Sequence, residues 1–254
     1  MKTKQKLNFL EWNNSIFISS IKKIDLNIIL ILFLDALFYL LSSYTVIFWL
    51  GRIQEKMAAF NLPADVISLG QQKANQLVSE VRAFYFLIIF SFVLLLLAII
   101  FLESILKGII WAKTTKTKIN FELISKFLVL NLIWMSFWFL LIFLISWLVN
   151  QYAAPKFMIV TIALGLYFTN TLYALFMENK KLKSVLHAIR LNITKIHLFL
   201  LPYAVIFLIF YVLIKITNLF KFKYSTVLLG LIILLYAAFV RYYVSALVLK
   251  IENA

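Results

Sequence analysis

Long apolar stretches recur along the chain and constrain its fold more than any other feature of the sequence. An α-helix needs about 17–25 apolar residues to cross the roughly 30 Å of hydrocarbon in a bilayer. Six stretches of this length lie at residues 26–50, 83–106, 127–149, 157–177, 198–214 and 225–249. The sequence therefore predicts an all-α fold, a polytopic transmembrane helical bundle of about six spans that makes one integral membrane domain over residues 1–254.

The composition supports this fold class and excludes several kinds of site. Hydrophobic residues make up 64% of the chain and charged residues only 14%, whereas soluble domains have about 45–50% and 25%. Cysteine is absent, which rules out disulfides, thiolate metal ligands and cysteine nucleophiles. The two histidines, His187 and His197, form no metal-ligating pattern. We therefore expect no metal and no cofactor.

Basic residues are divided unequally between the two sides of the predicted bundle. Of the 25 lysines and arginines, sixteen flank the spans on the side of the two termini, eight lie on the other side, and Arg241 lies inside a span. The positive-inside rule then predicts a multi-pass protein of the cell membrane with both termini in the cytoplasm. The net charge of +15 is carried by short blocks between spans, so nucleic acid is not an expected partner.

The segment between the first two spans, residues 51–82, is predicted to be an external helical hairpin. Its apolar residues recur at helical spacing, and the stretch Leu62-Pro63-Ala64-Asp65 supplies a break between two helices. The simpler interpretation is that the hairpin extends the two spans and packs on the membrane surface. The alternative is a small external cap over a cavity, or a docking site for a protein partner.

Residues 179–196 have the pattern of a cytoplasmic amphipathic helix in the membrane interface, and weaker versions occur near the N-terminus and at 121–126. The apolar face carries Leu182, Val185, Leu186, Ile189, Ile193 and Ile196. The basic residues are Lys180, Lys181, Lys183, Arg190 and Lys195, mostly on the other face. Basic residues near the surface attract anionic membrane lipids by about 1 kcal/mol each. Topology anchoring is the simpler interpretation, and regulated recognition of lipid or of a protein partner is the alternative.

Two ionisable residues, Asp35 and Arg241, lie within predicted spans, where a charge at the helix centre costs about 2.5–3.5 kcal/mol. Counted along their helices, they sit at roughly 13 and 12 Å from the cytoplasmic end. The sequence therefore predicts that they pair and face the bundle interior. Glu103, Asn131 and Asn170 fall in the same half of the membrane, which gives a predicted intramembrane polar layer.

Three roles are open for this polar layer. The simplest is a buried ion pair with amide hydrogen bonds that fix the register of the helices, with Glu103 pairing with Lys107 at the i+4 position. A pathway for a proton, an ion or a polar substrate is the second role. A contact with a partner subunit is the third.

Small residues in the spans indicate helix packing. Thr161, Gly165 and Thr169 recur every four positions in the fourth span, a stripe that lets another helix approach closely and marks this span as central. The five glycines of the chain are never clustered, and the patterns G-x-S-x-G, G-x-G-D and HExxH are absent. These absences exclude phosphate-binding loops and intramembrane protease signatures. We therefore expect no catalytic residues and no enzymatic activity.

The layout of the chain resembles that of a known group of membrane proteins. An N-terminal amphipathic helix leads into the first span, a long external loop follows, and basic elbows precede spans three and five, the second being residues 178–192 (ENKKLKSVLHAIRLN). This order is similar to that of prokaryotic six-span proteins that include the membrane domain of glycerophosphodiester phosphodiesterases. The resemblance covers most of the chain and implies a helical bundle without catalytic residues, because the family's hydrolase activity resides in a separate domain.

Two functions are compatible with this sequence. The first is a non-enzymatic integral membrane module that interacts with lipid, anionic on the cytoplasmic leaflet, or with a protein partner. The second is a transporter or permease subunit that uses the polar layer as its path and residues 179–196 as a coupling element. Transport sites are often built where Gly or Pro interrupts a helix, and here only Gly165, Pro202 and Gly230 interrupt the cores of spans.

Overall fold

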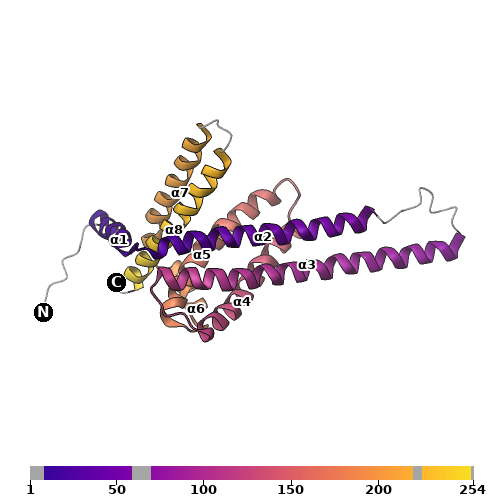
Figure 1. Cartoon of the computed structure of the whole chain (residues 1–254), viewed down its shortest axis with the longest axis horizontal. Helices are drawn as coiled ribbons and strands as arrows, with labels where there is room; N and C mark the ends of the chain where they lie inside the picture. Colours follow the sequence, from indigo (N-terminus) through magenta and orange to yellow (C-terminus); the bar gives the residue numbers. More distant parts are fainter. Residues whose placement is uncertain (1–8, 59–69, 220–224, 253–254) are drawn as a thin grey trace. The chain divides into compact units, whose positions relative to one another are not determined.

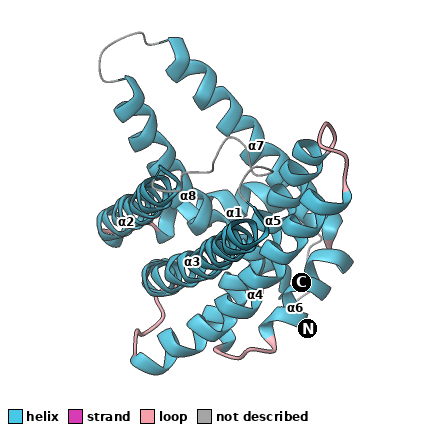
Figure 2. Cartoon of the chain, turned by 90° about the vertical axis from the view of Figure 1, so that its right-hand side faces the viewer, coloured by secondary structure: helices cyan, strands magenta, loops and turns pink. Residues whose placement is uncertain are grey.

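The computed structural model describes residues 9–58, 70–219 and 225–252. All regular secondary structure within these ranges is helical (Figure 2). The helices are α1 (Phe9–Lys23), α2 (Asn27–Ala58), α3 (Gly70–Thr114), α4 (Phe121–Leu148), α5 (Ala154–Asn179), α6 (Ser184–Thr194), α7 (Ile196–Leu219) and α8 (Ser225–Glu252), labelled in Figure 1. Six of them, α2, α3, α4, α5, α7 and α8, are long and apolar enough to cross a membrane. The predicted all-α membrane bundle is confirmed, and the protein is a multi-pass integral membrane protein.

The two helices that flank the predicted external hairpin are longer than the bilayer requires. Helix α3 has 45 residues, which corresponds to about 67 Å and is twice the thickness of the hydrocarbon layer. Residues 51–58 continue α2, and residues 70–82 continue α3, so the described parts of 51–82 extend the two spans as uninterrupted helices. The predicted break at 62–65 lies outside the described residues.

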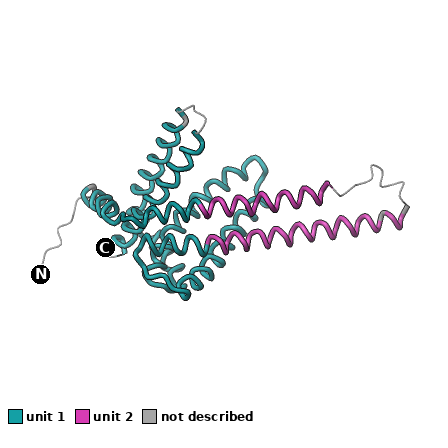
Figure 3. The backbone as a smooth tube through the Cα atoms, in the orientation of Figure 1, with its two compact units in different colours: residues 1–36, 104–254 teal, residues 37–103 magenta. Residues whose placement is uncertain are grey.

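The chain divides into two compact units, Met1–Ala36 with Ser104–Ala254, and Leu37–Glu103 (Figure 3). The smaller unit consists of segments of α2 and α3. Within it, the indole nitrogen of Trp49 donates a hydrogen bond of 3.1 Å to the hydroxyl of Ser91. The ring of Trp49 also lies 5.9 Å from that of Phe92. One tryptophan therefore ties the two helices of this unit together.

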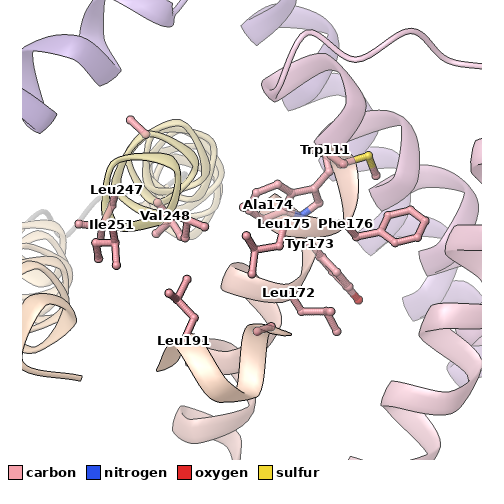
Figure 4. Close-up of a cluster of buried hydrophobic side chains, with 14 of the residues drawn as sticks. Trp111, Leu172, Tyr173, Ala174, Leu175, Phe176, Leu191, Leu247, Val248 and Ile251 are labelled. Atoms are coloured by element: carbon pink, nitrogen blue, oxygen red, sulfur yellow. The ribbon is translucent and has the colours of Figure 1, made fainter. Parts of the chain in front are cut away.

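The buried core of the larger unit lies at one end of its helices. Residues 171–177 of α5 and 241–248 of α8 are all buried, whereas the opposite ends of both helices expose large apolar side chains such as Ile159 and Leu231. Figure 4 shows Leu247, Val248 and Ile251 of α8 facing Leu175 and Leu191 across this core. Exposed apolar side chains on a spanning helix face lipid, so the tightest protein packing lies at this end alone.

Many of the lysines of the larger unit gather at this same end, which we call the lysine-rich end. It comprises the connection between α3 and α4 (residues 115–120), the turn between α5 and α6 (residues 180–183), α6, and the C-terminal turn of α8. Hydrogen bonds join these parts: the Thr117 hydroxyl donates to the Met177 carbonyl oxygen at 3.2 Å, and His187 Nε2 lies 3.1 Å from Glu252 Oε1. Lys250 Nζ donates to Ser15 Oγ and so holds α1 on α8.

The helix expected over residues 179–196 requires a correction. Helix α5 continues to Asn179, and Lys180 then adopts the left-handed conformation with φ of 53° while its N–H donates to the Phe176 carbonyl oxygen at 2.7 Å. A left-handed residue at this position ends a helix and turns the chain. The amphipathic helix that follows, α6, is therefore confined to Ser184–Thr194.

Candidate functional site

Three charged side chains from three helices meet inside the larger unit. Asp35 of α2 is 1% exposed. Its Oδ1 lies 2.7 Å from Nζ of Lys107 on α3, and its Oδ2 accepts a hydrogen bond from Nη2 of Arg241 on α8. The pair expected between Asp35 and Arg241 is thus present, and Lys107 is a third member that the sequence analysis did not place there. We call these three residues the ion cluster.

The geometry of the ion cluster favours a structural role. Each carboxylate oxygen of Asp35 is bound by a different cation, so one side chain links α2, α3 and α8. Buried charges in a membrane are stabilised when they pair with one another. The arrangement therefore fixes the relative positions of three helices at the depth of Asp35.

The remaining members of the predicted polar layer are Asn131, Asn170 and Glu103. Asn131 of α4 is buried, and its amide donates a hydrogen bond of 3.2 Å to the hydroxyl of Ser104 on α3. Asn170 is partly buried on α5, and Glu103 is partly exposed and belongs to the smaller unit. The structure thus contains an ion cluster and a separate amide–hydroxyl contact between α3 and α4.

The stripe of small residues on α5 faces two tryptophans of α4. The indole nitrogen of Trp134 donates a hydrogen bond of 2.8 Å to the Thr169 hydroxyl. A Cβ atom added at Gly165 would lie 3.5 Å from the ring of Trp138, and Thr161 is buried. The small residues were expected to let another helix backbone approach closely. The space beside them is instead filled by the indole rings of α4.

Helix α6 has three faces. The face packed on the bundle carries Ser184, Ala188, Leu191 and Asn192, all of them buried. A second face is apolar and open, with Leu186 74% and Ile193 61% exposed. The third is polar and carries His187, Arg190 and Thr194, which are also exposed. Of the predicted apolar face, Leu182, Leu186, Ile193 and Ile196 are exposed, whereas Val185 and Ile189 are half-buried against the core. The exposed part suits a helix at the boundary between acyl chains and water.

Asn192 explains how α6 is held with its apolar face outward. Its side-chain Oδ1 accepts a hydrogen bond of 2.9 Å from the Thr171 hydroxyl, and its backbone carbonyl oxygen accepts one of 3.1 Å from the Tyr167 hydroxyl. Both donors lie on α5. Sequence reasoning missed Asn192 as a packing residue; the available signal was an amide on the same helical face as Ala188 and Leu191.

The basic residues predicted to contact lipid surround α6. Lys180, Lys181, Lys183 and Arg190 are exposed, and Lys195 is partly exposed. Lys180, Lys181 and Lys183 lie in or beside the turn before α6, and Lys195 follows its last residue. Within the described ranges, no group of three or more His, Cys, Asp or Glu side chains is arranged to hold a metal ion.

Comparisons with known proteins were made at the levels of family, sequence and structure. No family model, curated protein or solved structure matches the chain. The resemblance to the membrane domain of glycerophosphodiester phosphodiesterases therefore stays a prediction based on layout.

Proposed function

We propose that the protein is a non-enzymatic membrane module whose lysine-rich end binds anionic lipids of the cytoplasmic leaflet. The observation that carries the proposal is the orientation of α6. Its exposed apolar side chains, Leu186 and Ile193, lie beside exposed basic ones, including Arg190. An exposed helix of this kind lowers its free energy by placing its apolar face among acyl chains and its cations near headgroups.

Charge and hydrophobic burial act together in this arrangement. The basic residues of the 180–195 segment each contribute about 1 kcal/mol of attraction to an anionic surface. Side chains such as Leu186 contribute roughly 25 cal/mol for each Å² of apolar surface that they remove from water. Because Asn192 and Thr171 hold α6 on α5, the basic and the apolar side chains of α6 keep one fixed orientation toward the membrane.

The ion cluster supports the non-transporting alternative. A path for a proton or substrate through this part of the membrane would need Asp35 to release a partner, and both of its oxygens are bound. Removing one partner of a buried pair costs about 3–5 kcal/mol. We therefore propose that the ion cluster positions the helices and that the lysine-rich end binds anionic lipid.

The absence of native cysteine allows a direct test with a fluorophore on single cysteines. Leu186→Cys and Ile193→Cys probe the open apolar face of α6, and Thr194→Cys is the matched control on the polar face. Each variant carries an environment-sensitive dye and is reconstituted with phosphatidylcholine or phosphatidylglycerol lipids that bear a quencher on the acyl chain. We expect quenching at 186 and 193 several times stronger than at 194, and stronger with phosphatidylglycerol than with phosphatidylcholine.

A charge-removal variant completes this experiment. Replacing Lys181, Lys183, Arg190 and Lys195 with glutamine removes four cations while keeping the apolar face. The preference for phosphatidylglycerol at position 186 is expected to weaken severalfold, and quenching there is expected to persist. Equal quenching at 186 and 194, or an unchanged lipid preference after charge removal, would contradict the proposal.

A further inference from the structure

A cavity opens at the lysine-rich end, close to α6 but formed by other parts of the chain. Its volume is about 410 Å³. Its walls come from residues 115–118, from Ala174, Met177, Glu178 and Lys180, and from Ser245 and Leu249 of α8. Three lysines line it, namely Lys116, Lys118 and Lys180. Glu178 is the single acidic residue among its lining residues.

The charges that line this cavity are unbalanced. Lys116 lies 3.3 Å from Asp25. Burial and the neighbouring charge of Lys116 lower the pKa of Lys23 below its ordinary value, although Glu178 acts in the opposite direction. Among the lining residues, three lysines face one carboxylate, Glu178. Three further carboxylates adjoin them from outside the lining: Asp25 pairs with Lys116, Glu252 lies beside Glu178, and Glu122 acts on Lys180. An anion in the cavity would relieve the repulsion between these cations.

The polar wall of the cavity also carries two hydroxyl groups. Thr115 and Thr117 both line it, and their Oγ1 atoms lie 2.9 Å apart. The Thr115 hydroxyl donates to the Trp111 carbonyl oxygen and the Thr117 hydroxyl to that of Met177, so the lysine ammonium groups are the donors that remain for a phosphate oxygen. The apolar wall, with Ala174, Met177 and Leu249, offers a surface for carbon atoms next to such a headgroup. One cavity therefore combines cations with an apolar side.

The backbone at the cavity is unusual as well. Among the described residues, Lys116 and Lys180 are the two non-glycine residues with positive φ, 57° and 53°. Both line this cavity. Glycine adopts this conformation without the steric penalty that a side chain brings. Lysine at both positions is thus unfavourable for local stability, and it supplies two of the three cations on the cavity wall.

We propose that this cavity is a binding site for the phosphate of an anionic lipid headgroup, with Lys116, Lys118 and Lys180 as its cations. This inference rests on the proposed function, the binding of anionic lipid, and gives that function one defined site. Inorganic phosphate offers the same oxygen acceptors to lysine as the phosphate of a lipid headgroup does. The lipid is favoured as the source because the cavity lies where spanning helices α3, α5 and α8 end.

The test uses the full chain in a nonionic detergent and native mass spectrometry with palmitoyl-oleoyl phosphatidylglycerol or the matching phosphatidylcholine. The site variant carries Lys116→Gln, Lys118→Gln and Lys180→Gln. The control carries Lys181→Gln, Lys183→Gln and Lys195→Gln, three lysines outside the residues that line the cavity. We expect the apparent Kd for phosphatidylglycerol to rise on the order of a hundredfold in the site variant and only severalfold in the control, because the control lysines are attracted to the charge of a whole bilayer surface, which a nonionic micelle lacks.

A competition experiment distinguishes lipid from free anion. Inorganic phosphate is added at increasing concentration to the wild-type protein loaded with phosphatidylglycerol. We expect the lipid to remain bound at a phosphate concentration a hundred times that of the lipid. Displacement at equal concentrations would identify a site for a free anion and overturn the assignment to lipid.

Lys180→Gly separates binding from folding. Glycine suits the left-handed conformation at 180, so the thermal unfolding temperature is expected to rise by a few degrees. The affinity for phosphatidylglycerol is expected to fall by about fivefold to tenfold in the same protein. Unchanged affinity in this more stable variant would overturn the proposal.

Failure of the site and failure of the proposed function give different results. If the site variant binds phosphatidylglycerol as the wild type does while charge removal around α6 weakens lipid preference, the cavity proposal is overturned and the proposed function stands. If the wild-type protein binds phosphatidylglycerol and phosphatidylcholine equally in detergent and in bilayers, the cavity proposal and the proposed function are both overturned.

Discussion

Asp35→Ala is expected to lower the free energy of unfolding by about 3–5 kcal/mol, because it leaves two buried cations without their shared anion. Lys107 and Arg241 each bind one oxygen of this carboxylate. Lys107 is 13% exposed, and its long side chain can turn toward the membrane surface. Arg241 has less freedom, since its side chain is 8% exposed. Thermal unfolding in detergent, followed by intrinsic tryptophan fluorescence, measures the loss.

A second substitution shows whether the loss arises from the unpaired charge. Combining Asp35→Leu with Arg241→Met removes one cation together with the carboxylate and is expected to recover most of the stability. Glu55→Ala is the matched control, because Glu55 pairs with Arg52 at a site where the Glu55 side chain is 68% exposed. Its effect is expected to stay within about 1 kcal/mol. Wild-type stability of Asp35→Ala would contradict the structural role and return the ion cluster to a candidate transport path.

Gly108→Leu is expected to destabilise the larger unit by about 3 kcal/mol through overpacking. A Cβ atom at this position would lie 3.0 Å from Cδ1 of Phe127 and 3.2 Å from Cδ1 of Ile124, both on α4. Phe127 is fully buried in the core, so its ring has little room to move. The same unfolding measurement detects this loss.

Gly230→Leu provides the comparison for this substitution. A Cβ atom at Gly230, inside α8, meets no atom within 4 Å. Leucine is favoured over glycine in a helix by roughly 0.5–1 kcal/mol, so Gly230→Leu is expected to leave stability unchanged or to raise it. A similar loss of stability in the two variants would mean that the contact between α3 and α4 at Gly108 is not as close as described.

The spans and the ion pair were predictable because they depend on local properties of the sequence. Each span is a run of apolar residues, and the depths of Asp35 and Arg241 follow from counting residues along two helices. Lys107 was missed because it lies at the end of its apolar stretch, where a lysine ordinarily faces water. Its side chain reaches inward because a carboxylate on another helix lies 2.7 Å away, and sequence alone does not give that distance.

The error at residues 179–196 has a similar origin. Helical periodicity continues across 180–183, but Lys180 takes a conformation that breaks the helix. The outward direction of the apolar face of α6 depends on contacts of Asn192 with Tyr167 and Thr171, about twenty residues away in the sequence. For the stripe at 161–169, the spacing of small residues predicted the face used in packing, whereas its tryptophan partners on α4 are known only from the structure.

The proposed function requires the lysine-rich end to lie at the cytoplasmic leaflet, where anionic lipid is available to it. Single cysteines at Lys181 and Tyr152 test this, because Lys181 lies in the turn before α6 and Tyr152 in the turn between α4 and α5. Both residues are exposed. A membrane-impermeant maleimide is applied to intact cells and to permeabilised cells. We predict that Tyr152→Cys reacts in intact cells and Lys181→Cys only after permeabilisation, and labelling of Lys181→Cys in intact cells would contradict the account.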